Sequence, residues 1–226
     1  MPSSPDVRSA TGLLVSGGLD SAILLGHLLS GGSRVRPLYV DSGMAWQRDE
    51  LASLRRFLDA LGGRYAGLQE LVVLDVPVAD LYGPHWSLTG CDVPDATSAD
   101  DAVYLPGRNV LLLVKAALWC QLHGIEELAI GVLQGNPFAD ATAAFFDPFA
   151  AALRTALGRP LRIVRPLADK SKREVLSLGL DLPLEHTFSC IAPQEGLHCG
   201  RCNKCAERRA AFRALEIEDP TPYRVA

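Results

Sequence analysis

The first group of residues suited to chemistry is a short loop near the start of the chain. The sequence SGGLDS covers residues 16–21 and lies between the apolar run of residues 12–15 and a segment, AILLGHLL, with helical periodicity. Glycines let the backbone approach an anion closely, and N–H groups at the start of a helix attract negative charge. An ordinary glycine-rich turn does not explain why strand, loop and helix occur together. We therefore expect a phosphate site made of Ser16, Gly17, Gly18, Leu19, Asp20 and Ser21.

Asp20 distinguishes this loop from the commonest nucleotide loop. The Walker pattern GxxxxGK[ST] supplies a lysine to the phosphates, whereas SGGLDS supplies a carboxylate and no lysine. Magnesium is usually bound by one or two carboxylates together with phosphate oxygens. The sequence therefore favours a nucleotide site in which Mg²⁺ accompanies the phosphates.

The second group is a set of cysteines near the C-terminal end of the sequence. Its members are Cys190, Cys199, Cys202 and Cys205, spaced C-x8-C-x2-C-x2-C. Four thiolates match tetrahedral zinc and leave no open position for water, so we assign the site to structure. Structural zinc binds zinc-finger peptides with about 10–16 kcal/mol at neutral pH. An iron–sulfur cluster or a redox pair stays open, because four thiolates alone do not exclude iron. Cys120 lies in an apolar helical segment and is expected to be a buried small hydrophobe.

Regular structure must position both groups, and the hydrophobic pattern predicts alternating strands and helices. Strands are expected at residues 12–15, 35–40, 71–78, 127–132 and 161–167, and helices at about 47–61, 109–123, 141–157, 171–179 and 206–215. This alternation predicts an α/β fold with a doubly wound parallel sheet. Residues 1–183 are expected to form the nucleotide-binding domain and residues 184–226 a zinc-binding tail with a terminal helix. The aperiodic connection at 82–104 is expected to be a substrate loop.

Composition limits the class of protein. The formal net charge is −4, with 48% hydrophobic and 21% charged residues, which is ordinary for a globular protein and unlike a disordered one. This acidic balance gives no whole-protein attraction to nucleic acid, so no stable nucleic-acid partner is expected. The sequence lacks a basic start followed by an apolar segment, and no stretch approaches the roughly 18 apolar residues of a membrane span. We therefore expect a cytoplasmic protein without a membrane partner.

Several motifs together carry a resemblance to a known family. SGGLDS resembles the signature of the ATP-pyrophosphatase, or PP-loop, superfamily. With LPGRN at 105–109, PL-x4-K-x-E at 166–174 and HCGRCNKC at 198–205, the chain resembles the 7-cyano-7-deazaguanine synthase family, often called QueC or ExsB, over almost its whole length. The resemblance implies a Rossmann-like fold of the adenine nucleotide alpha hydrolase type. It further implies a zinc-bound homodimer that adenylates 7-carboxy-7-deazaguanine and combines it with ammonia to give the nitrile, in queuosine biosynthesis.

The resemblance also implies roles for particular residues. Arg108 and Lys172 would steady the ATP phosphates, with Gly107 beside Arg108 in the ATP site, while Asp20 would place Mg²⁺. Asp20, Arg108 and Lys172 are therefore the expected catalytic residues. Two plainer interpretations stay open: Asn109 as the N-cap of its helix, and Lys172 as a solvated helix residue.

The sequence departs from the family in its substrate segments. The segment WQRDE, residues 46–50, keeps Gln47 and Arg48 but has an aspartate where the family has histidine. The segment FADATAAF, residues 138–145, keeps Asp140 but has alanine and threonine in place of the family's cysteine and arginine. Gln47, Arg48 and Asp140 are the expected substrate residues. Arginine is the natural bidentate partner of a carboxylate. Its loss leaves open an amide product, a different heterocyclic acid, or transfer of the acyl group to an amine on a macromolecule.

Two other classes of protein are compatible with parts of the pattern. A tRNA-thiolating PP-loop enzyme would share the loop and carry cysteine pairs, but it must bind tRNA, which the acidic balance does not favour. A non-enzymatic nucleotide-binding module, whose zinc knuckle holds a partner, predicts ATP binding without AMP formation. Asp20, Arg108 and Lys172 supply more charge than such a passive site needs.

Overall fold

The computed structural model describes residues 10–224 and contains a five-stranded parallel sheet of order β3-β2-β1-β4-β5. The strands are β1 Thr11–Leu14, β2 Val35–Asp41, β3 Val72–Asp75, β4 Glu127–Ala129 and β5 Arg162–Val164. The main helices are α1 Leu19–Ser30, α2 Gln47–Gly62, α5 Arg108–Leu122, α6 Ala143–Leu157, α7 Lys172–Ser177 and α8 Asn203–Ala214. The expected α/β fold with a parallel sheet is confirmed. No helix of the described residues is long and apolar enough to span a membrane.

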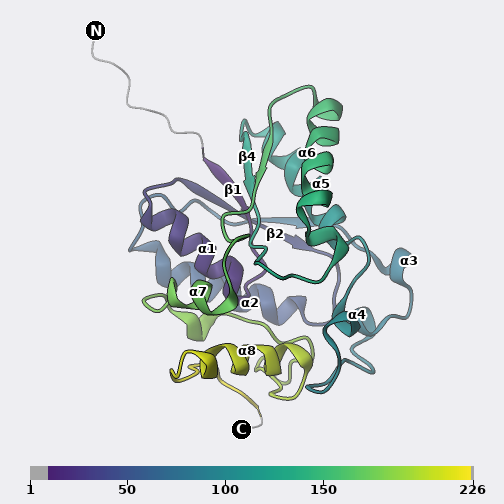
Figure 1. The fold of residues 1–226 in the computed structure, drawn as a ribbon, viewed down its shortest axis with the longest axis vertical. Helices are drawn as coiled ribbons and strands as arrows, with labels where there is room; N and C mark the ends of the chain where they lie inside the picture. The colour runs from purple at the N-terminus through teal and green to yellow at the C-terminus, as the bar shows by residue number, and fades with distance from the viewer. Residues whose placement is uncertain (1–9, 225–226) are drawn as a thin grey trace.

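Helices cover both faces of the sheet, as Figure 1 shows, with α1, α2 and α7 on one side and α5 and α6 on the other. Successive strand residues point to opposite faces, so neighbours in β1 enter different cores. Leu13 packs in a cluster with α1, α2 and α7, whereas Leu14 packs in a cluster with α5 and α6. Both side chains are buried. The sheet is therefore doubly wound, with β1 at its centre.

Several predicted boundaries differ from the structure, and β4 and β5 each end three residues earlier than predicted. The edge strand β3 ends at Asp75 instead of residue 78, and the short helix α3 follows at Ala79–Tyr82. Helix α6 begins at Ala143, because the hydroxyl oxygen of Thr142 accepts a hydrogen bond from the N–H of Phe145 and caps the helix. Helix α8 begins three residues earlier than predicted and so contains Cys205 in its first turn.

The last part of the chain packs against the rest of the molecule. Phe212 of α8 belongs to the core cluster of α1 and α2, and Phe188 packs in a third cluster with Trp46 and Leu105. The expected irregular connection at 82–104 contains a second short helix, α4 Trp86–Thr89, and pairs through Asp95 with Cys202. Residues from far apart in the sequence thus meet beyond the carboxyl ends of the strands.

Candidate active site

A cavity of about 330 Å³ lies where the carboxyl ends of β1, β2 and β4 meet the start of α1 and α5. In a doubly wound sheet, two neighbouring strands near the centre are followed by connections that run to opposite faces of the sheet. The crevice between these connections, at the topological switch point, is the usual ligand site. Here β1 is the central strand, with β2 on one side and β4 on the other. The fold itself thus places the cavity beside the SGGLDS loop.

The loop before α1 is held in one shape by its own serines. Ser21 accepts a hydrogen bond at Oγ from the N–H of Ser16 at 3.1 Å and donates to the carbonyl of Gly18 at 3.2 Å. Gly17 has φ +76, which favours glycine, and an added Cβ would meet the backbone oxygen of Glu50 at 3.3 Å. Gly18 is the N-cap of α1 and has no side chain to occupy the first N–H groups of the helix. The cavity therefore faces a helix start suited to an anion.

Four charged side chains form a chain of ion pairs beside this loop. Nζ of Lys172 lies 2.9 Å from Oδ1 of Asp20 and 3.3 Å from Oε1 of Glu207, whose other oxygen lies 2.8 Å from Nζ of Lys204. Burial acts to lower the pKa of Lys172, but the negative charges of Asp20 and Glu207 have the larger effect. The pKa of Lys172 is therefore raised. Lys172 is therefore paired at the site, and its alternative interpretation as a solvated helix residue is wrong.

The start of α5 brings Arg108 and Asn109 to the cavity. Gly107, with φ 73, is the N-cap, so the helix begins at Arg108 and the interpretation of Asn109 as N-cap is wrong. The Asp140 carboxylate accepts from the N–H of Asn109 at 3.0 Å, and the Asn109 amide donates to the Asp140 carbonyl at 3.0 Å. Nε of Arg108 is buried without a hydrogen-bond partner among the described residues. The guanidinium therefore retains a free donor.

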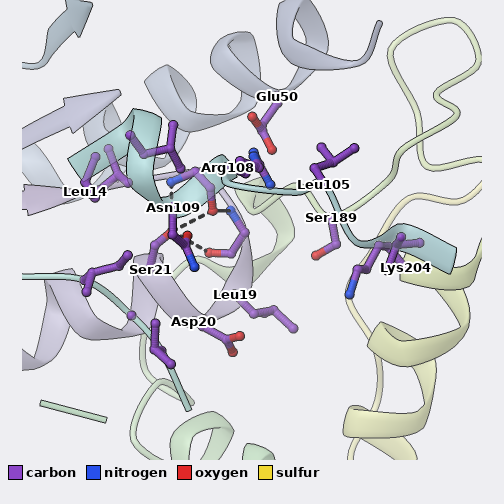
Figure 2. A pocket seen from close by; sticks show the side chains of 18 of the residues that line it. Leu14, Leu19, Asp20, Ser21, Glu50, Leu105, Arg108, Asn109, Ser189 and Lys204 are labelled. Carbon is purple, nitrogen blue, oxygen red and sulfur yellow. Dashed lines mark hydrogen bonds between the residues drawn. The ribbon is translucent and has the colours of Figure 1, made fainter. Parts of the chain in front are cut away.

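Glu50 is a cavity residue that the sequence analysis missed. Its Oε2 accepts a hydrogen bond from the Tyr39 hydroxyl at 2.7 Å, deep in the wall of the cavity. Burial raises the pKa of Glu50 to about 7, against the opposing effect of the Arg108 charge. Figure 2 shows the Glu50 carboxyl group and the Arg108 side chain pointing toward each other. At neutral pH, the Glu50 carboxyl group is therefore partly protonated.

The expected substrate residues do not share one role. Gln47 lines the cavity, but its amide oxygen accepts from the N–H groups of Ser42 and Met44, and its nitrogen donates to Val40. Its side chain therefore fixes the loop after β2. Arg48 is exposed and lies outside the cavity lining, because one residue along a helix turns the side chain by about 100°. Arg48 thus does not line this cavity, and its role toward the substrate stays a prediction.

The departures at 138–145 also have a structural account. Asp140 lines the cavity, but Ala141 is buried in the core beside α5 and α6. The hydroxyl group of Thr142 caps α6 and donates to the carbonyl of Ala139 at 3.1 Å. Neither position contributes to the cavity lining, so this segment gives the cavity one carboxylate and no cation.

The four cysteines of the C-terminal segment come together in the structure. Their sulfur atoms all lie within 4.8 Å of one another, and every one of the four residues is a buried, free cysteine. The Cys190–Cys202 and Cys199–Cys205 sulfur pairs are each 3.9 Å apart. Tetrahedral zinc with Zn–S bonds of 2.3 Å places sulfur atoms about 3.8 Å apart. The cluster therefore fits a zinc site, with residues from the loop before α8 and from its first turn.

The segment that holds the cysteines also supplies part of the cavity wall, which the sequence analysis did not foresee. Ser189, Lys204, Glu207 and Arg208 all line the cavity. The buried Arg208 donates to Ser189 Oγ at 3.3 Å and to the carbonyl of Leu184 at 3.0 Å. The backbone N–H of Phe188 donates to the carbonyl of Gly17 at 2.7 Å. The SGGLDS loop and the cysteine segment therefore form one site.

The SGGLDS loop at the switch point of a doubly wound parallel sheet, beside a four-cysteine cluster that fits zinc, defines the class of this protein: a PP-loop α/β protein. The family model described as "Queuosine biosynthesis protein QueC" matches residues 11–216. The chain belongs to the QueC family.

Similar proteins agree in length as well as in sequence. The chain is 34% identical to a 7-cyano-7-deazaguanine synthase of Anaeromyxobacter dehalogenans (strain 2CP-C), with 93% of this chain and 94% of the relative covered. It is 30% identical to a synthase of the same name from Chlorobium phaeobacteroides (strain BS1), with 94% and 96% covered. A solved 4-thiouridine synthetase–RNA complex with bound ATP aligns at 15% identity and a TM-score of 0.46, over 92% of this chain and 50% of that one.

Proposed function

We propose that the protein is a 7-cyano-7-deazaguanine synthase, an ATP-dependent ligase that forms the nitrile from 7-carboxy-7-deazaguanine and ammonia. The observation that carries the proposal is the QueC family match over residues 11–216, with the PP-loop and the four cysteines inside it. Relatives that carry this name match over more than nine-tenths of their own length. The amide-forming, tRNA-thiolating and non-enzymatic alternatives have no comparable support.

The reaction needs two activations by ATP, because a carboxylate loses two oxygens on the way to a nitrile. In the first, a carboxylate oxygen attacks the α-phosphorus and pyrophosphate leaves. Ammonia then attacks the carbonyl carbon, AMP departs with one oxygen, and an amide forms. In the second, the amide oxygen is adenylated in the same way, and loss of AMP and protons gives the C≡N bond. Catalysis here depends on positioning and charge stabilisation.

Residues at the PP-loop end of the cavity are assigned to the phosphates. The N–H groups at the start of α1 and the ammonium of Lys172 would bind the departing pyrophosphate. Asp20, 2.9 Å from Lys172, has the carboxylate oxygens that suit Mg²⁺, which would neutralise charge on the phosphates. Arg108 lines the cavity, its Nε has no hydrogen-bond partner within residues 10–224, and it is assigned to the charge that develops during adenylation. These are roles within the proposal.

Glu50 is assigned to proton transfer. Ammonia that has attacked an acyl group must lose a proton, and a general base works best with a pKa near the working pH. The pKa of about 7 and the place of Glu50 in the cavity wall, opposite Arg108, suit this step. Tyr39 holds the carboxyl group in position through its 2.7 Å hydrogen bond.

Mass spectrometry of one reaction tests the function. The purified, metal-loaded protein is mixed with 7-carboxy-7-deazaguanine, MgATP and ammonium, and both the heterocycle and the adenine nucleotides are followed. We expect the nitrile and two AMP per nitrile, with no nitrile when ammonium is omitted. An unchanged heterocycle would refute the proposed substrate, and accumulation of the amide alone would refute the second step. Zinc at the four cysteines, a homodimer and a cytoplasmic location remain part of the proposal.

A further inference from the structure

We propose that Lys204, which lies between two cysteines of the C-terminal cluster, binds the nucleotide phosphates, so that the cysteine segment supplies a cation to the nucleotide site. This inference rests on the proposed function only in that the cavity binds ATP. It concerns a residue outside the loop, LPGRN and PL-x4-K-x-E motifs, and it gives the metal segment a part in substrate binding.

The position of Lys204 is set by the cysteines around it. Cys202 is the N-cap of α8 and Cys205 lies in the first turn, so Lys204, one of the two residues between them, is held close to two of the four cysteines. Lys204 lines the cavity, and 31% of its side chain is exposed. Figure 2 shows Lys204, Ser189 and Asp20 directed toward the same space from three different segments. A bound metal would therefore hold this ammonium group at the cavity wall.

Glu207 links Lys204 to the residue already assigned to phosphate. One Glu207 oxygen lies 2.8 Å from Nζ of Lys204 and the other lies 3.3 Å from Nζ of Lys172. An isolated surface pair of this kind at i,i+3 contributes little to stability. Here, however, a single carboxylate holds two ammonium groups from different helices beside the PP-loop. Glu207 therefore keeps both ammonium groups beside the PP-loop, where a pyrophosphate group has negative oxygens for both.

The charges near the loop support the same conclusion. Asp20 and Glu207 offset Lys172 and Lys204, so this cluster is formally neutral before a nucleotide arrives. If Lys172 acted alone, Asp20 and Glu207 would leave an excess of negative charge at the phosphate end of the cavity. Lys204 removes this excess, and Glu207 acts as a positioning residue for both lysines.

The test compares two cations that have the same relation to the cysteines. Lys204 directly precedes Cys205 and Arg201 directly precedes Cys202, but Arg201 is exposed and outside the cavity lining. Lys204→Met, Lys204→Arg and Arg201→Met are prepared as metal-loaded proteins, and metal content is measured by mass spectrometry. Binding of Mg-pyrophosphate and of Mg-α,β-methylene-ATP is measured by calorimetry, with no deazapurine present.

We expect Lys204→Met to keep its metal and to weaken binding of both probes by about tenfold or more, the usual effect of losing a hydrogen bond to a charged group. Lys204→Arg should retain most of the affinity, and Arg201→Met should bind like the wild type. Equal affinity of metal-loaded Lys204→Met and wild type would overturn the inference. If Lys204→Met loses its metal, Lys204→Gln, which keeps a polar side chain at this position, is the deciding variant: weaker binding of both probes supports the inference and unchanged binding overturns it.

The same experiment separates this inference from the proposed function. Because the probes contain no heterocycle, a wrong carboxylate substrate leaves the result intact. A wild-type protein that binds neither probe would overturn both proposals, whereas tight wild-type binding that is insensitive to Lys204 overturns only this one.

Discussion

Replacing Glu50 by Gln is expected to change the dependence of stability on pH. The pKa of Glu50 is raised by burial from its ordinary value of 4.5 to about 7, so the folded protein holds a proton that the unfolded chain releases. This stabilises the fold below pH 4.5, and the contribution is lost as pH rises through 7. The difference between these two pKa values corresponds to about 3 kcal/mol in the free energy of unfolding, of which about 2.5 kcal/mol is lost between pH 5 and pH 8.

Gln has nearly the same size and stays neutral at every pH. The free energy of unfolding of Glu50→Gln minus that of the wild type should therefore rise by about 2.5 kcal/mol between pH 5 and pH 8. Urea denaturation of the metal-loaded proteins at several pH values measures this difference, and subtraction removes the pH dependence of metal binding, which both share. Glu126→Gln, at an exposed position, is the control and should give a flat difference. A flat difference for Glu50→Gln as well would refute the reasoning.

Three further predictions concern the loop, the metal centre and the packing of the central strand. Asp20→Asn should lower AMP formation by about a hundredfold or more, since a ligand for Mg²⁺ is lost, and a near-normal rate in a nucleotide assay would contradict that role. Cys202→Ser should lose metal and thermal stability, because it removes one of four ligands at the start of α8; full metal content would require a different ligand set. Gly12→Ala should cost about 1–3 kcal/mol in urea denaturation, because the new Cβ lies 2.6 Å from Cys120 Sγ, and Cys120→Ala in the same chain should restore most of it. Simple addition of the two single costs would show that the atoms do not clash.

Features set by local sequence were predictable. Glycines and serines in SGGLDS determine their own turn, so the loop and the helix after it could be inferred from adjacent residues. The capping box at the start of α7 is likewise local, because Ser171 and Glu174 are three positions apart. The cysteine spacing predicted a four-sulfur cluster, because three of its members lie within seven residues of one another.

Residues that depend on tertiary contacts were harder to predict, although one error was avoidable. Leu54 and Phe57 are buried on α2, and counting back from Leu54 by four and by seven residues reaches Glu50 and Gln47. The helical phase thus turns those two side chains inward and leaves Arg48 exposed, which the motif comparison alone did not reveal. By contrast, the contact of Glu207 with Lys172 joins two residues that are 35 positions apart on different helices, and nothing in either segment specifies it.

The hydrogen bond from Phe188 to the carbonyl of Gly17 has a consequence for the order in which the protein is made. During translation, β1 and the PP-loop leave the ribosome long before the cysteine segment exists. Asp95 must likewise wait for Cys202 before its bridge forms. A nascent chain can therefore pair β1, β2 and β3 early, but its nucleotide site is completed only after the cysteine segment has been made.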